Sequence, residues 1–528
     1  MDESRRSSAT VVAYLGLIGV VAWLAWRIAP GRAAGVTGND PATYVQMAYD
    51  LAQRGAVLHT FPGMAEAESL GAHPALLAPA GYLPRGENRL LALPLYPVGW
   101  PLLLALGYLA AGDFGLYLVL PTVALLAALV TWRLGPGVTG GGGRPLLPLV
   151  APRPWAAAGA AFALALLLTV REQRAYALAV MSDVPVQALA VLSLWLAWRA
   201  ARQRRPAFAL GAGLALGYGY LIRHTLALVA LPVLWMIWAA GRREGRLSKT
   251  IWLLVGLTPL LLPDLLYNRL YLGGWLAPES PASLTFDPAL IGPTLDELVN
   301  RPVSFGWSFA LFWLGLPLLV IHRQGRRAFI PLLLWVVGYV GFHAGLAFTA
   351  EFGNVVRYNL PALPGVAIIA AAPLAWLGSQ VERRVGRAGP ILRPAALWSL
   401  GLIAPALLLR SQPDAHFIAY GFLDADARAA YAAVGEALPP DAVIVTDDQH
   451  AGALALYTDL AVARAQYWPP AEQAAFLNGM SQAGRPVCTL GTPAYPIDFM
   501  LAYGALPTGV RLAHPPDGSD GIVHCLPG

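Results

Sequence analysis

Charged residues are scarce in this chain. Only 12% of its 528 residues are charged while 57% are hydrophobic, and a soluble domain usually carries about 25% charged residues. Such a sequence has too little polar surface to face water along its whole length. It is therefore predicted to be a polytopic membrane protein, and its 17 Trp and 20 Tyr suit side chains that settle at membrane–water interfaces.

Cysteine and lysine are rarer still. The two cysteines, Cys488 and Cys525, exclude a cysteine-based metal cluster and a dense disulfide framework, and whether they bond to each other stays open. Lys249 is the one lysine, so nearly all basic residues are arginines. Arginine clusters beside apolar runs are typical of topology signals, so they do not indicate nucleic-acid binding.

Apolar runs of spanning length recur along the first 410 residues, and about 20 such residues cross a bilayer. They predict about eleven transmembrane helices, at 9–28, 115–132, 154–170, 184–198, 206–222, 225–240, 250–268, 304–321, 328–348, 358–377 and 393–409. The first run follows Arg5 and Arg6, which predicts an uncleaved signal-anchor with a cytoplasmic N-terminus.

A further apolar run at 93–112 decides the topology. If it crosses, the arginine clusters of the later loops all lie outside, against the positive-inside rule; if it does not cross, they all lie in the cytoplasm. Pro94, Pro97, Gly99 and Pro101 also interrupt its first half. We therefore predict a re-entrant or interface-lying helix here. The protein is predicted to lie in the cell membrane with its C-terminus on the extracytoplasmic side.

Two hydrophilic regions then lie outside. The first is the loop 29–114, in which a helix from Pro41 with Tyr44 and Met47 on one apolar face is expected to lie along the membrane surface. The second is the tail, where strand-like and helix-like runs alternate. The predicted domains are thus a transmembrane module over 1–410 and a small extracytoplasmic α/β domain over 411–528.

Two acidic residues at predicted helix starts are candidates for chemistry. Asp40 lies in GNDPATY and Asp183 in MSDVP, each near the outer end of an apolar or amphipathic helix. Carboxylates at membrane boundaries are costly unless they are paired or functional. Helix capping is the simpler interpretation of both, since each comes just before or close to a Pro that favours a helix start.

Three arginines accompany these acids. Arg174 lies on the same predicted loop as Asp183, Arg223 lies between two apolar runs, and Arg357 lies at the outer end of another. A guanidinium at these places can bind a lipid phosphate with two parallel hydrogen bonds. Alternatively, each side chain extends to the interface, or Arg357 pairs with Glu351.

The order of these motifs resembles that of the C-type, multi-span glycosyltransferases, such as protein O-mannosyltransferases and aminoarabinose transferases. The matching segments run in sequence over nearly the whole chain: GNDPATYVQMAYDLAQRG, YPVGWPLLLALGYLAAGD, MSDVP, LIRHTLALVALP, YNRLYLGG and RYNLPALPGVAIIAA. Each motif is weak alone, and their order and spacing carry the resemblance.

The resemblance implies a glycosyltransferase that takes a sugar from a polyprenyl-phosphate donor and moves it to a hydroxyl of a lipid, glycan or protein outside the cytoplasm. Asp40 would be the general base and Asp183 would orient the acceptor or the base. The substrate-binding residues would be Tyr44, Tyr96, Arg174, Arg223 and Arg357, with the arginines on the phosphate. Direct displacement would invert the anomeric carbon.

One position departs from the resemblance. Many relatives carry a second acid directly after the first Asp, and this chain has Pro41 there. No cofactor is therefore firmly implied, and a divalent cation is disfavoured. Two other functions remain open: a lipid flippase or transporter, which also has many spans, and a non-catalytic membrane scaffold whose tail binds a partner. The halves of the chain show no correspondence of the kind common in transporters.

Overall fold

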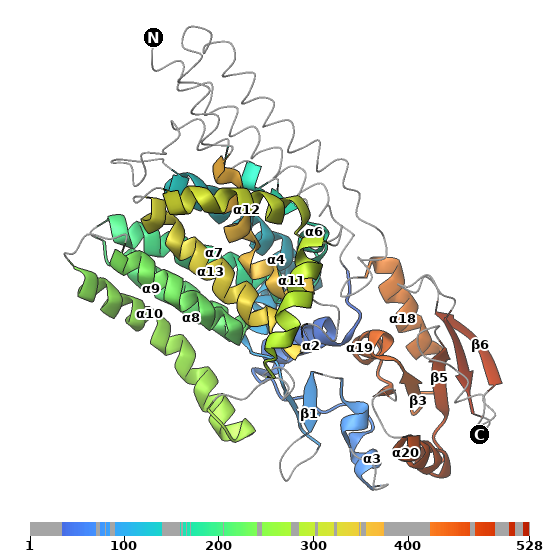
Figure 1. The fold of residues 1–528 in the computed structure, drawn as a ribbon. Coiled ribbons are helices and arrows are strands. Elements are labelled where there is room, and N and C mark those ends of the chain that lie inside the picture. Colours follow the sequence, from blue (N-terminus) through green and yellow to red (C-terminus); the bar gives the residue numbers. More distant parts are fainter. Residues whose placement is uncertain are drawn as a thin grey trace. The chain divides into compact units, whose positions relative to one another are not determined.

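A computed structural model divides the chain into two compact units (Figure 1). Unit 1 comprises 1–27, 121–177 and 182–413; unit 2 comprises 28–120, 178–181 and 414–528. The structure describes residues 34–69, 74–79, 81–84, 90–139, 159, 162–164, 166–168, 170–203, 205–239, 245–275, 285–300, 305–321, 325–347, 349, 355–373, 423–464, 470–491, 506–512 and 521–526.

Unit 1 is helical. Its described elements are α6 (Arg171–Tyr176), α7 (Asp183–Arg202), α8 (Ala207–Ile222), η2 (His224–Val229), α9 (Ala230–Ala239), α10 (Arg246–Tyr267), η3 (Asn268–Leu272), η5 (Pro288–Leu290), α11 (Ile291–Asn300), α12 (Gly306–Ile321), α13 (Gly325–Ala344), α15 (Val355–Asn359) and η6 (Leu360–Ala362). Figure 1 shows α8 beside α10. Gly213 and Gly256 let their backbones approach closely, as small residues do between membrane helices.

Several helices occupy predicted spans. Among the described residues, four helices are long and apolar enough to cross a membrane: Gly99–Gly135, Asp183–Arg202, Arg246–Leu272 and Val355–Pro373. Shorter apolar helices are Ala207–Ile222, His224–Ala239 and Ile330–Ala344. Most apolar side chains of α10 are exposed, which suits contact with lipid. The predicted spans at 9–28 and 393–409 lie outside the described residues, so the number eleven stays a prediction.

The ambiguous run at 93–112 ends at a break. Helix α4 (Gly99–Thr139) has non-helical backbone at Ala111 and Gly112, and Gly107 contacts Gly115 across this turn. The segment 99–111 alone is roughly 20 Å long, too short for a hydrocarbon core of about 30 Å. Its Leu106 and Leu109 are exposed. These features favour the interpretation that 93–112 does not cross.

Unit 2 joins the predicted first outer loop to the tail. The loop forms α2 (Asn39–Arg54), α3 (Met64–Ser69), η1 (Pro74–Leu77), β1 (Tyr82–Pro84) and β2 (Ala92–Pro94), followed by the start of α4. The tail forms α18 (Ala425–Ala437), β3 (Val443–Thr446), α19 (Asp448–Tyr457), β4 (Ala461–Arg464), α20 (Pro470–Gln482), β5 (Val487–Gly491), β6 (Leu506–Leu512) and β7 (Gly521–Cys525). The sequence-based division instead placed the loop with the transmembrane module.

The tail strands form one five-stranded sheet in the order β4-β3-β5-β7-β6. β3 pairs in parallel with β4 and β5, whereas β7 pairs antiparallel with β5 and β6. The parallel connections run through α19 and α20, as parallel strands require. Figure 1 shows α18 and α19 on the side of the sheet opposite α20.

Each face of this sheet has its own hydrophobic core. On one face, Val443 and Val445 pack with α20 and with first-loop residues that include Met47. Met47 is therefore buried in this core, and Tyr44 is buried with its ring against Tyr96. Our expectation that this apolar face of α2 lies on the membrane surface is wrong. On the other face, Ile444 and Cys488 pack with α18 and α19.

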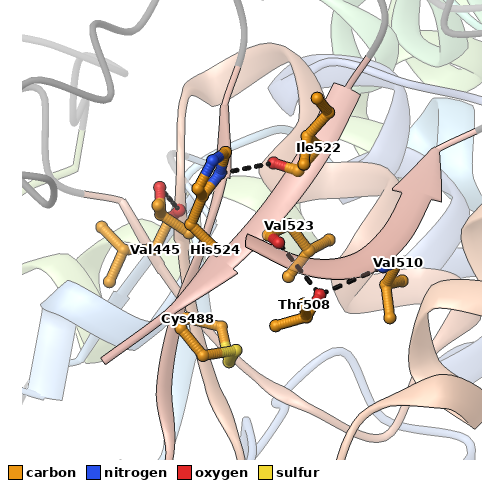
Figure 2. Close-up of a disulfide and its surroundings, with 9 residues drawn as sticks. Val445, Cys488, Thr508, Val510, Ile522, Val523 and His524 are labelled. Carbon is orange, nitrogen blue, oxygen red and sulfur yellow. Dashed lines mark hydrogen bonds between the residues drawn. A yellow bond between two sulfur atoms is a disulfide. The ribbon is translucent and has the colours of Figure 1, made fainter. Parts of the chain in front are cut away.

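A disulfide joins the two cysteines across neighbouring strands (Figure 2). Cys488 on β5 lies directly opposite Cys525 on β7. The two residues are 37 positions apart in sequence. The pairing that the sequence left open is thus decided by the strand register.

Candidate functional site

Asp40 lies in the first turn of α2, not at its cap. The helix begins at Asn39, and Gly38, with φ of 77°, is its N-cap. The Tyr96 hydroxyl donates a hydrogen bond of 2.6 Å to Oδ1 of Asp40. The Tyr44 ring, one turn further along α2, lies 5.0 Å from the Tyr96 ring. Three of the predicted site residues are therefore brought together in unit 2.

Asp183 forms the centre of a second group, in unit 1. It is the first residue of α7 and its side chain is 0% exposed. Its Oδ1 accepts a hydrogen bond from Nη1 of Arg223, and its Oδ2 accepts one of 3.2 Å from Nε of Arg357. The two arginines are themselves buried. These three side chains together carry one net positive charge, because two guanidiniums face one carboxylate.

A tyrosine ring supports both guanidiniums. The ring of Tyr358 lies 4.6 Å from the guanidinium carbon of Arg223 and 5.3 Å from that of Arg357. Tyr176 lies 5.8 Å from the guanidinium carbon of Arg357. Cation–π contacts at such distances favour a desolvated arginine. Tyr358 belongs to the RYNLPALPG motif, but the sequence pattern predicted no role for it.

A break in the helix lets Arg223 reach this group. Its backbone is extended, with φ of −157° and ψ of 121°, and it separates α8 from η2. Consecutive side chains therefore reach different neighbours. His224 Nε2 lies 3.2 Å from Asp264 Oδ1, and Thr225 Oγ1 lies 2.9 Å from the Tyr339 hydroxyl.

A glutamine pair holds α7 in place beside this group. Gln187, one turn after Asp183, donates to the Leu360 carbonyl oxygen at 2.7 Å. It also exchanges hydrogen bonds of 2.9 and 2.7 Å with Gln173. These buried amides connect α7 to the segment that carries Arg357. Nothing in the local sequence distinguished Gln187 from other polar residues of apolar helices.

Arg174 is placed differently from the other two arginines. Its Nη1 donates to the Leu168 carbonyl oxygen at 2.8 Å. Its role in phosphate binding stays a prediction. Asp40 and Asp183 belong to different units, so the expectation that they face one cavity also stays a prediction. Glu351, the alternative partner of Arg357, lies outside the described residues.

Among the described residues, no group of three or more His, Cys, Asp or Glu side chains is arranged to hold a metal ion. At Asp40, the neighbouring Pro41 supplies no side-chain ligand, and Tyr96 donates a hydrogen bond to the carboxylate. We derive no step that requires a metal.

A polar network connects the tail to α2 and to the segment that precedes it. Asp113, just after the break in α4, accepts a 2.9 Å hydrogen bond from Tyr49 and pairs with Arg428 of α18 at 2.6 Å. The Tyr457 hydroxyl accepts a 2.7 Å hydrogen bond from the backbone N–H of Val36. Burial raises the pKa of Tyr49, and the charge of Asp113 raises it further.

Comparison with known proteins defines the class of fold. ArnT from Cupriavidus metallidurans in the apo state matches with a TM-score of 0.56 at 15% identity, covering 98% of each chain. The same protein bound to undecaprenyl phosphate matches with a TM-score of 0.54 at 14% identity, covering 96% of this chain and 97% of that one. The archaeal oligosaccharyltransferase AglB from Archaeoglobus fulgidus matches with a TM-score of 0.53 at 12% identity, covering 90% and 69%.

The chain therefore shares its fold with ArnT and AglB, and the resemblance predicted from its motifs is confirmed at the level of the fold. Residues 149–266 also match the family model described as dolichyl-phosphate-mannose-protein mannosyltransferase. That segment contains Asp183 and Arg223. No curated protein sequence matches the chain significantly.

Proposed function

We propose that this protein is a membrane glycosyltransferase that moves a sugar from a polyprenyl-phosphate donor to an acceptor hydroxyl on the extracytoplasmic side. The observation that carries this proposal is the buried group of Asp183, Arg223 and Arg357. Its two guanidiniums are buried among apolar helices, where a charged side chain is costly unless it is paired or functional. Guanidiniums held in this way can bind a lipid phosphate with two parallel hydrogen bonds.

The fold relatives support the choice of donor. ArnT was solved with undecaprenyl phosphate, and AglB was solved with an inhibitory peptide and a dolichol phosphate. Undecaprenyl phosphate and dolichol phosphate are both phosphates of polyprenyl-type lipids. By analogy, the arginines of this chain would bind the phosphate of the donor and offset the charge that grows on it as it leaves. Asp183 would then act by orienting both guanidiniums, since its carboxylate accepts a hydrogen bond from each.

Asp40 is proposed as the general base. The acceptor oxygen attacks the anomeric carbon as its proton passes to a carboxylate oxygen of Asp40. The bond between the anomeric carbon and the phosphate oxygen breaks, and polyprenyl phosphate departs with its electron pair. Phosphate is already a good leaving group, so a second carboxyl acid is not needed, unlike in glycoside hydrolysis. One displacement inverts the anomeric configuration.

The test uses the full-length protein in lipid nanodiscs with a panel of synthetic undecaprenyl-phosphate pentoses and hexoses. Mass spectrometry measures released undecaprenyl phosphate and glycosylated product. Asp40→Asn should lower turnover by about 10²–10⁴-fold while donor binding stays nearly intact. Normal turnover in Asp40→Asn would remove Asp40 as the base. Donor binding without turnover of any sugar in the wild-type protein would instead favour a transporter or scaffold.

A further inference from the structure

Tyr96 is placed to fix the orientation of the proposed base. Its hydroxyl donates to Asp40 Oδ1 at 2.6 Å, and its ring lies 5.0 Å from that of Tyr44. A hydrogen bond to one carboxylate oxygen restricts rotation of the carboxylate and directs the other oxygen. To do this, the hydroxyl must stay within a narrow range of positions. That range is set by the atoms that pack against the Tyr96 ring.

Gly81 supports the Tyr96 ring at close range. It is buried and directly precedes β1, and its carbonyl oxygen accepts a 2.8 Å hydrogen bond from the Leu95 N–H. A Cβ atom at position 81 would lie 2.6 Å from Cε2 of Tyr96, and closer still to the side chain of Thr43. Real Cβ atoms essentially never show contacts below 3.0 Å. The backbone of Gly81 is not left-handed, so its need for glycine is purely steric.

Neither neighbour can readily yield to an added methyl group. Thr43 is fully buried on α2, and a Thr side chain in a helix is restricted to two χ1 rotamers. In Tyr96 the crowded atom, Cε2, is bonded to the carbon that carries the hydroxyl. A methyl group at 81 would therefore displace the hydroxyl that holds Asp40.

We propose that Tyr96 is a positioning residue for Asp40, and that glycine at position 81 is required because it lets the Tyr96 ring reach Asp40. This inference rests on the proposed function of Asp40. It revises the sequence-based expectation that Tyr96 binds substrate. Neither residue touches the reacting atoms in this scheme, since both act through the carboxylate.

The test is a double-mutant cycle in the nanodisc assay. Tyr96→Phe and Gly81→Ala should each lower kcat by roughly 10–100-fold, because small misplacements of a catalytic group have effects of this order. The KM for the donor should be unchanged in both. The double variant should be no slower than the slower single variant, because both changes remove the same hydrogen bond.

Two other glycines provide matched controls. A Cβ at Gly452 of α19 would also press on the start of α2, but its three nearest atoms belong to Gly38 and Ala42 rather than to Tyr96. The fold-reductions in kcat caused by Gly452→Ala and by Tyr96→Phe should therefore multiply in the double variant. Gly292, in α11, has no heavy atom within 4 Å of its added Cβ, so Gly292→Ala should leave kcat unchanged.

The outcomes separate this inference from the proposed function. Active Asp40→Asn protein would refute the base assignment. Inactive Asp40→Asn with a normal kcat in Tyr96→Phe would overturn the positioning role alone. Multiplying effects of Gly81→Ala and Tyr96→Phe would show that Gly81 acts by another route. If Gly81→Ala does not fold, Tyr96→Phe still decides the role of Tyr96, and the cycle is repeated with Gly81→Ala combined with Thr43→Ala, which removes the two Thr43 atoms nearest the added Cβ.

Discussion

The buried ion-pair group provides a test of charge balance in unit 1. Asp183→Asn keeps the size of the side chain but removes a carboxylate that both Arg223 and Arg357 contact, and all three side chains are buried. Breaking a buried ion pair by removing one partner costs about 3–5 kcal/mol, because it leaves an uncompensated charge. The ratio of folded to unfolded protein should fall by roughly two to four orders of magnitude.

The unfolding midpoint of the full chain in detergent is measured by tryptophan fluorescence. Asp264→Asn is the matched control, since Asp264 is also a buried acid of unit 1 but interacts with His224 and Asn268. Loss of these weaker interactions should cost about 1–3 kcal/mol. If Asp183→Asn is no less stable than Asp264→Asn, the reasoning from buried charge is refuted.

The same pair of variants tests the phosphate site. Undecaprenyl phosphate brings a negative charge that can replace the lost carboxylate. It should therefore raise the unfolding midpoint of Asp183→Asn more than that of Asp264→Asn. Equal increases would place the phosphate away from Arg223 and Arg357.

Three further predictions follow from unit 2 and the topology. The pKa of Tyr49 is raised in the folded state, so just above pH 10 its hydroxyl ionises only in the unfolded chain. The stability of the protein should therefore fall as pH rises past 10, and it should fall less steeply in Tyr49→Phe. Unfolding midpoints measured across that pH range check this. Replacing Cys488 and Cys525 by Ser should destabilise the tail by about 2–4 kcal/mol, and thiol labelling of the wild-type chain should require prior reduction. A reporter fused after Arg410 should be extracytoplasmic and one within 199–206 cytoplasmic; a cytoplasmic C-terminus would contradict the site assignment.

Local sequence patterns predicted most individual elements of this fold. Apolar runs have the period and length of helices whatever their partners, so α7, α8 and α10 lie where the sequence placed them. In the tail, β3, β4, β5 and β7 coincide with the strand-like runs AVIVT, LAVAR, PVCTL and GIVHCL. By contrast, β6, which contains Pro507 and Gly509 and has an irregular register, carried no clear strand pattern.

What the sequence by itself determined is which residues are unusual; what the tertiary structure decided is which of them meet. Asp40 and Asp183 were conspicuous because acids at membrane boundaries are costly. That Asp183 meets arginines 40 and 174 positions away, and that Tyr96 meets Asp40 across 56 positions, depends on packing between elements. No local pattern encodes such pairs, because each side chain alone is equally compatible with a cap, the interface or another partner.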